Sequence, residues 1–107
     1  MKMTVQEYLQ QDGKSPYQQW FDQLPAQAAA KVATAKVRME LGNISAIKWF
    51  DGIGEYRIHW GPGLRIYLAR DGEKIILLLG GGDKSSQRRD IARAKEHWSD
   101  YRARKTN

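Results

Sequence analysis

The stretch GEYRIHWGPGLRIYLARDGEKIILLLGGGDKSS, residues 54–86, carries the strongest strand signals in the chain. Polar and apolar residues alternate over residues 55–60 and again over residues 64–68, which is typical of strands with one buried face. Gly61-Pro62-Gly63 and Asp71-Gly72 mark the turns between the strands. The stretch therefore predicts an antiparallel meander whose apolar face the rest of the chain must cover.

The expected register separates the polar and apolar side chains of the first two strands. A three-residue loop over residues 61–63 pairs Ile58 with Ile66 on the core face and Arg57 with Tyr67 on the other face. An even-numbered loop would pair Arg57 with an apolar residue, since a shift of one residue exchanges the two faces. We therefore expect the odd-numbered loop.

The second hairpin continues into an apolar strand and a run of glycines. A two-residue turn at Asp71-Gly72 places Ile75 and Leu77 on the core side of the sheet. The run from Lys74 to Leu79 is apolar on both faces, as in a strand that is covered on two sides. Gly80-Gly81-Gly82 then predicts a flexible exit from the sheet.

Two helices are expected before this meander. Ser15-Pro16 is an N-cap followed by a proline at the first helical position, which predicts a short helix through Gln23. A second helix follows Pro25 and ends at Gly42-Asn43. Its apolar residues recur at helical spacing and form the expected buried stripe: Ala26, Ala30, Ala33, Val37 and Leu41.

Three further segments complete the expected fold. Residues 4–9 suggest a brief edge strand, and residues 43–51 show no clear period. The last helix should run from Gln87 to roughly Arg104. Its expected buried residues are Ile91, Ala94, Trp98 and Tyr101. The prediction is a single α+β domain over residues 1–107, with an N-terminal αα-hairpin packed on a mainly antiparallel meander of about four strands, and with a C-terminal helix.

Composition limits the class of protein. The chain has 107 residues, 41% hydrophobic and 28% charged, which fits one folded domain with a modest core. It has no cysteine, so disulfides and thiolate metal sites are excluded. The N-terminal sequence has no apolar run typical of a signal peptide, and no run is long enough to span a bilayer. We expect a cytoplasmic protein that does not contact a membrane.

The chain is basic. Eighteen Lys and Arg against twelve Asp and Glu give a net charge of +6. Such a balance favours an anionic partner, either nucleic acid or an acidic protein. The simpler alternative is a basic surface that contacts only water.

Charged residues gather on the outer face of the predicted sheet. They lie in adjacent cross-strand positions together with one aromatic residue: Glu55, Arg57, His59, Arg65 and Tyr67. Neighbouring cations repel each other unless a carboxylate or a bound anion compensates them. One interpretation is a solvated face with a Glu–Arg pair. The other is an anion site, in which Arg57 and Arg65 bind phosphate and Tyr67 adds a hydroxyl and a stacking surface.

The segment after the glycines favours the second interpretation. Asp83, Lys84 and Ser85 lead into a helix, whose N-terminal N–H groups attract anions. The segment is not a nucleotide-binding P-loop. That motif has a glycine directly before its lysine, and Asp83 occupies this position here. The alternative is a helix cap formed by Asp83 or Ser85.

These residues carry a resemblance to a known family. Glu55-Tyr56-Arg57, the segment from Gly63 to Tyr67 and the segment from Gly81 to Gln87, following a pair of helices, resemble the RelE/ParE superfamily of bacterial type II toxins. The similarity is to the phage-derived, HigB-like "addiction module killer protein" branch and extends over nearly the whole chain. It implies a RelE-like α+β fold and a toxin made beside an antitoxin, usually a small helix-turn-helix protein. Many members cleave mRNA on the ribosome.

The resemblance also implies roles for individual residues. Arg57, Arg65, Tyr67 and Lys84 match the family's strand arginines, strand aromatic and lysine before the last helix. Such cations would stabilise a phosphorane formed by attack of the RNA 2′-hydroxyl, with no metal ion or cofactor. Glu55 or His59 could act as general base or acid; histidine titrates nearest neutrality. The simpler interpretation of His59, a rim histidine beside Trp60 and the turn, is favoured over a catalytic role. The expected RNA-binding set is Arg57, Arg65, Tyr67, Lys84, Ser85, Arg88 and Arg89.

Two classes of function remain open from the sequence. The first is a metal-independent endoribonuclease. The second is a protein without enzymatic activity, either a ParE-like inhibitor of DNA gyrase or a non-toxic homologue that binds an antitoxin. The long basic final helix departs from many ribosome-dependent members of the family. Three partners are open for its cations, namely rRNA, an acidic antitoxin or only water: Arg88, Arg89, Arg93 and Lys95.

Overall fold

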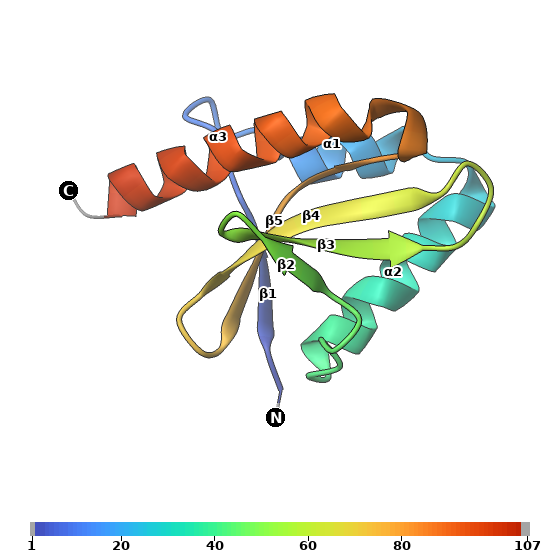
Figure 1. Cartoon of the computed structure of the whole chain (residues 1–107), viewed down its shortest axis with the longest axis horizontal. Helices are drawn as coiled ribbons and strands as arrows, with labels where there is room; N and C mark the ends of the chain where they lie inside the picture. Colours follow the sequence, from blue (N-terminus) through green and yellow to red (C-terminus); the bar gives the residue numbers. More distant parts are fainter. Residues whose placement is uncertain (1, 106–107) are drawn as a thin grey trace.

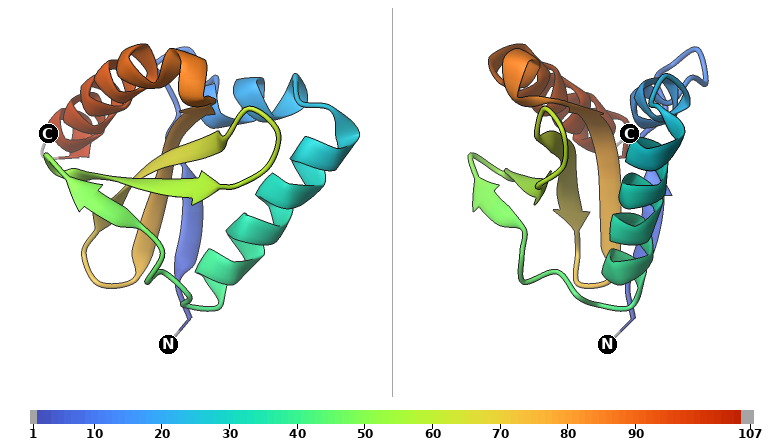
Figure 2. Two further views of the ribbon diagram at one scale, coloured as in Figure 1. Left: turned by 45° about the vertical axis from the view of Figure 1, so that its right-hand side comes forward. Right: turned by 90° about the vertical axis from the view of Figure 1, so that its right-hand side faces the viewer.

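The computed structural model describes residues 2–105. This part of the chain forms β1 (Thr4–Glu7), α1 (Pro16–Asp22), α2 (Ala26–Glu40), β2 (Lys48–Phe50), β3 (Ile53–Ile58), β4 (Leu64–Asp71), β5 (Ile75–Gly82), the 3-10 turn η1 (Lys84–Ser86) and α3 (Gln87–Lys105). The strands form one five-stranded sheet in the order β1-β5-β4-β3-β2. Helices α1 and α2 pack on one face and α3 packs on the other (Figure 1, Figure 2).

The sheet is mixed, which corrects the expected meander of about four strands. Strands β2 to β5 do form an antiparallel meander. The expected N-terminal edge strand is present as β1, and it runs parallel to β5 as the fifth strand of the sheet. Its position covers the edge of an apolar strand that would otherwise be open to intermolecular pairing. The unassigned segment before β3 supplies β2, which forms the opposite edge of the sheet.

Helices α1 and α2 do not form the expected αα-hairpin. They are joined by only three residues, 23–25, but α2 turns away from α1 and descends across the sheet (Figure 2). Each helix therefore packs on the sheet more than on the other helix. The predicted start of α1 is confirmed, because the Ser15 side chain accepts a hydrogen bond from the Gln18 N–H and Pro16 occupies the first turn.

The buried stripe of α2 is not the predicted one. The residues that enter the core are Ala28, Val32, Ala35 and Met39. The predicted stripe lies on the opposite side of the helix, where Val37 is 52% and Leu41 is 56% exposed. Helix α2 carries two stripes of small or apolar residues, both at helical spacing. Periodicity therefore cannot indicate which of them faces the sheet.

The β3–β4 hairpin has the predicted faces but a longer loop. Ile58 pairs with Leu64, so the loop spans residues 59–63 rather than three residues. Arg57 consequently lies opposite Arg65, not opposite Tyr67. Both loop lengths are odd, so the two faces are unchanged and Arg57, Arg65 and Tyr67 still share one face of the sheet.

The register of the β4–β5 hairpin is shifted from the predicted register by an odd number of residues. Strand β4 continues to Asp71, which pairs with Ile75 across a loop of residues 72–74. This loop exchanges the two faces of β5, so Leu77 packs toward α3 rather than toward α1 and α2. Two residues of α3, Tyr101 and Lys105, also donate hydrogen bonds to the Asp71 carboxylate. The apolar strand offered no alternation from which this register could be read.

The glycine run is part of β5 rather than a flexible exit. Gly80 lies next to an irregularity in the β4–β5 pairing. A Cβ atom at Gly81 would overlap the indole ring of Trp20, and one at Gly82 would overlap the carboxylate of Asp90. The glycines therefore allow α1 and α3 to approach the two sides of the same strand.

Helix α3 confirms its predicted extent and face. It begins at Gln87 and ends at Lys105. Its four predicted core residues pack with Tyr67, Leu77 and Leu79 on the second face of the sheet. Among residues 2–105, no helix combines the length and the apolar character needed to cross a membrane.

The close contact between Trp20 and Gly81 gives a first prediction. Gly81→Ala should lower the free energy of unfolding by about 1–3 kcal/mol, because the added methyl group forces the indole or the strand to move. Urea denaturation followed by tryptophan fluorescence measures this change. In the Trp20→Ala background, the same substitution should cost much less. Equal costs in both backgrounds would contradict the contact.

Candidate functional site

An open groove of about 610 Å³ lies between the β3–β4 loop and the start of α3. We call it the Arg57–Lys84 groove. Its polar lining residues are Arg57, His59, Arg65, Lys84 and Gln87, and its remaining lining residues are Ile58, Gly61, Pro62, Gly63 and Leu64. Within the described part of the chain, no Asp or Glu lines it. The groove is therefore suited to an anionic group.

Backbone pairing brings the cations of this groove together. Arg57 on β3 and Arg65 on β4 are direct cross-strand partners. Lys84 is the first residue of η1, and its backbone N–H donates to the Pro62 carbonyl at 3.3 Å. This bond closes the β3–β4 loop onto the segment that follows β5. The structure thus places Lys84 beside the two strand arginines.

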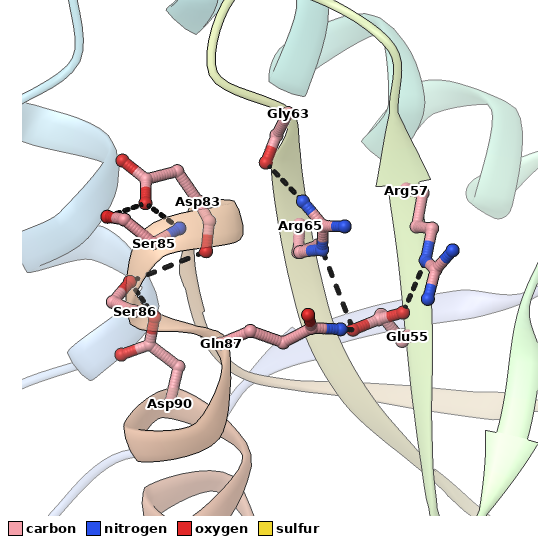
Figure 3. Close-up of polar contacts among 9 residues, drawn as sticks. All are labelled: Glu55, Arg57, Gly63, Arg65, Asp83, Ser85, Ser86, Gln87 and Asp90. Carbon is pink, nitrogen blue, oxygen red and sulfur yellow. Dashed lines mark hydrogen bonds and ion pairs between the residues drawn. The ribbon is translucent and has the colours of Figure 1, made fainter.

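Glu55 is the buried counter-charge of this cluster. Its side chain is 1% exposed. Oε1 accepts a hydrogen bond from Arg57 Nε at 2.7 Å, and Oε2 accepts one from Gln87 Nε2 at 2.9 Å. Arg65 Nε lies 3.8 Å from Oε2. Figure 3 shows the three side chains converging on this carboxylate.

The environment of Glu55 keeps it ionised. Burial alone would raise the pKa of its carboxyl group, but the hydrogen bonds from Arg57 and Gln87 outweigh burial and hold the pKa below its usual value. Both oxygens are already occupied as acceptors. Glu55 therefore orients the two arginines, and it does not present a free oxygen to the groove.

The two arginines differ in accessibility. The side chain of Arg65 is 9% exposed, and its Nη1 donates to the Gly63 carbonyl at 2.7 Å. Gly63 has φ +79°, and a Cβ atom there would lie 2.8 Å from that nitrogen. The side chain of Arg57 is 44% exposed. Arg57 is therefore the guanidinium that can most readily contact a ligand.

Tyr67 shares the sheet face of the arginines, as predicted, but does not line the groove. It is fully buried beneath α3. Its hydroxyl lies near the Glu55 carboxylate but makes no hydrogen bond of normal geometry among residues 2–105. Burial, reinforced by the charge of Glu55, raises the pKa of the phenol. Tyr67 is thus placed as a neutral buried ring, and the expected stacking on a base would need α3 to move.

The remaining predicted residues are spread over other surfaces. Ser85 donates from its N–H and hydroxyl to Asp83, which caps η1 as the sequence suggested. Arg88 lines another hollow, along the first turns of α3. Arg89 lines the groove between α1 and α3. The structure does not bring Arg88 and Arg89 to the Arg57–Lys84 groove.

Gln87 is the site residue that the sequence did not identify. It is the first residue of α3 and is separated from Glu55 by 32 positions in the chain. A buried carboxylate between two arginines still needs donors for its second oxygen. The sequence did indicate that the last helix starts soon after β5, the strand next to β4, so its first turn was expected near Arg65. That signal favours no particular residue of the first turn.

Comparison with known proteins places the chain in a family. It is 41% identical over 81 residues to a Haemophilus influenzae protein described as uncharacterized. The match covers 74% of this chain and 82% of that protein. The chain therefore belongs to the same family as the Haemophilus protein. No protein-family model matches the sequence.

The lowered pKa of Glu55 gives a second prediction. Because the pKa in the folded state lies below the unfolded value, the ionised carboxylate stabilises the fold above the unfolded pKa, and this stabilisation is lost as the pH falls through the folded pKa. Glu55→Gln should lower the free energy of unfolding at pH 7 by about 1–3 kcal/mol. The deficit should shrink in acid.

The measurement is urea denaturation of both proteins from pH 7 down to pH 3. Glu73→Gln, at an exposed position in the β4–β5 loop, is the matched control and should differ little from the wild type. A deficit for Glu55→Gln that stays constant with pH would contradict the ionised state of Glu55.

Proposed function

We propose that this chain is the toxin of a type II toxin–antitoxin pair and cleaves mRNA without a metal ion. One observation carries the proposal. Arg57, His59 and Lys84 line a single groove in which no carboxylate is among the described lining residues. Such a groove supports binding of a phosphodiester and stabilisation of added negative charge. The proposed reaction takes place on the ribosome or on free mRNA, and a cognate antitoxin, of the helix-turn-helix class, neutralises the protein.

The proposed reaction uses a nucleophile from the RNA itself. The 2′-oxygen attacks the adjacent phosphorus and loses its proton to a base, forming a pentacovalent phosphorane. The bond from phosphorus to the 5′-oxygen then breaks, and an acid protonates that oxygen. The products are a 2′,3′-cyclic phosphate and a free 5′-hydroxyl, so water is not consumed in this step.

The lining residues suit distinct parts of this reaction. Arg57 and Lys84 stabilise the phosphorane, since both cations reach the groove. Arg65 is more buried, and its positive charge stabilises the bound phosphate from the floor of the groove. His59 is exposed at the rim and is the proposed proton carrier. Glu55 keeps Arg57 and Arg65 in position, a role that fits its two occupied oxygens better than that of a base.

Expression without a partner tests the function, and is our third prediction. The wild type should arrest bacterial growth and create new transcript ends that carry a 5′-hydroxyl. Arg57→Ala and Lys84→Ala should each reduce cleavage about 100-fold, because each removes a donor to the phosphorane. Lys74→Ala, an exposed lysine away from the groove, should cleave normally. Mapping of 5′ ends measures all four proteins.

The same experiment separates the competing class of function. Growth arrest with intact transcripts would overturn the endoribonuclease. Accumulation of DNA gyrase cleavage complexes in those cells would support the gyrase inhibitor instead. If the cells grow normally and the transcripts stay intact, the chain is not an active toxin.

Proton transfer gives a fourth prediction. His59→Ala should lower the rate of RNA cleavage by a factor of about 100 or more and should leave RNA binding within about twofold. The matched control is His97→Ala, because His97 stacks on Tyr8 at 4.8 Å on α3 and is not a lining residue of the groove. Single-turnover cleavage with excess protein separates the two effects. Unchanged cleavage by the His59 variant would assign proton transfer elsewhere.

A further inference from the structure

A second groove adjoins the Arg57–Lys84 groove on its α2 side. This α2 groove measures about 330 Å³. Its lining residues come from α2 and β3: Lys31, Thr34, Ala35, Arg38, Tyr56, Arg57, Ile58 and His59. Arg57, Ile58 and His59 line both grooves. The two hollows therefore form one continuous surface with Arg57 at its centre.

The charge on this surface has a single sign. Among the described residues, its ionised side chains are all cationic: Lys31, Arg38, Arg57, Arg65 and Lys84. The groove between α1 and α3 is different, because Asp83, Asp90 and Glu96 line it together with Arg89 and Arg93. Five of the eighteen Lys and Arg residues of the chain thus line the path from η1 to α2, with no carboxylate among the described lining residues. Such a continuous path fits a polyanion better than a single small anion.

Lys31 and Arg38 lie together on the side of α2 that lines the groove. Their positions in the chain differ by seven, so they lie on the same side of α2, about 10 Å apart along its axis. Both are exposed, and neither forms an ion pair within residues 2–105. Thr34 lies between them but donates its hydroxyl to the Ala30 carbonyl at 3.0 Å. The two cations are therefore the main donors that α2 presents to this groove.

We propose that the RNA strand cleaved in the Arg57–Lys84 groove continues over α2, where Lys31 and Arg38 bind its phosphates. This inference rests on the proposed function and extends its substrate site by one helix. The occupant is single-stranded RNA, since the path follows a phosphodiester that is already bound at Arg57. Lys31 and Arg38 contribute to affinity and take no part in proton transfer.

The test, our fifth prediction, measures RNA affinity as a function of salt concentration. Wild type, Lys31→Ala/Arg38→Ala and the control Lys36→Ala/Lys74→Ala are titrated with a labelled single-stranded RNA oligonucleotide, and anisotropy is recorded from 50 to 300 mM KCl. Loss of two phosphate contacts should make the plot of log K against log [salt] shallower by about 1.4, at about 0.7 per contact. The control also removes two cations, but neither lines the two grooves.

Each outcome has a clear meaning. A shallower slope and weaker binding for the Lys31/Arg38 variant alone would support the path over α2. Equal slopes for this variant and the control would overturn the path, while the Arg57 and Lys84 variants would still test the proposed function separately. Loss of binding to an acidic protein or to ribosomes, with unchanged binding to the oligonucleotide, would also overturn it. A wild type that does not bind the oligonucleotide and also leaves transcripts intact in cells would refute the proposed function, and the path with it.

Discussion

The buried carboxylate of Glu55 is the interaction on which the site depends. Two arginines on neighbouring strands would repel each other without it, and the first residue of α3 completes its hydrogen bonds. A β-hairpin and the distant first turn of α3 are thus joined at one anion in the protein interior. Removing a charge from such a buried cluster leaves the opposite charges uncompensated, so the cluster constrains strands and helix together.

The two faces of the sheet serve different purposes. The face under α1 and α2 is a continuous apolar core. The face under α3 is apolar only toward one end, where Tyr67 and Ala94 pack, and becomes ionic toward the β3–β4 loop. Helix α3 therefore covers a hydrophobic surface with its body and completes a polar cluster with its first turn. The position of the groove follows from where that helix begins.

Sequence patterns predicted the parts of this arrangement that have clear alternation. The faces of β3 and β4, and the buried side of α3, followed from period alone. Strand β5 is apolar on both faces, and α2 carries two apolar stripes, so neither pattern could decide an orientation. The parallel pairing of β1 was missed because four residues carry little signal. Contacts across long separations, such as Gln87 with Glu55, depend on the fold and cannot be read from local spacing.

The pairing of β1 with β5 also bears on the order in which the molecule can assemble. Residues 4–7 cannot pair until residues 75–78 are present, and Glu55 lacks one of its hydrogen bonds until Gln87 is in place. Pairings of such long separation form slowly, because the entropy of closing the loop must be lost before the contacts are gained. On the ribosome, β1 therefore stays unpaired until β5 has emerged, and the charge cluster stays incomplete until α3 has emerged. The groove therefore forms only near the end of synthesis, when the last segments of the chain join the sheet.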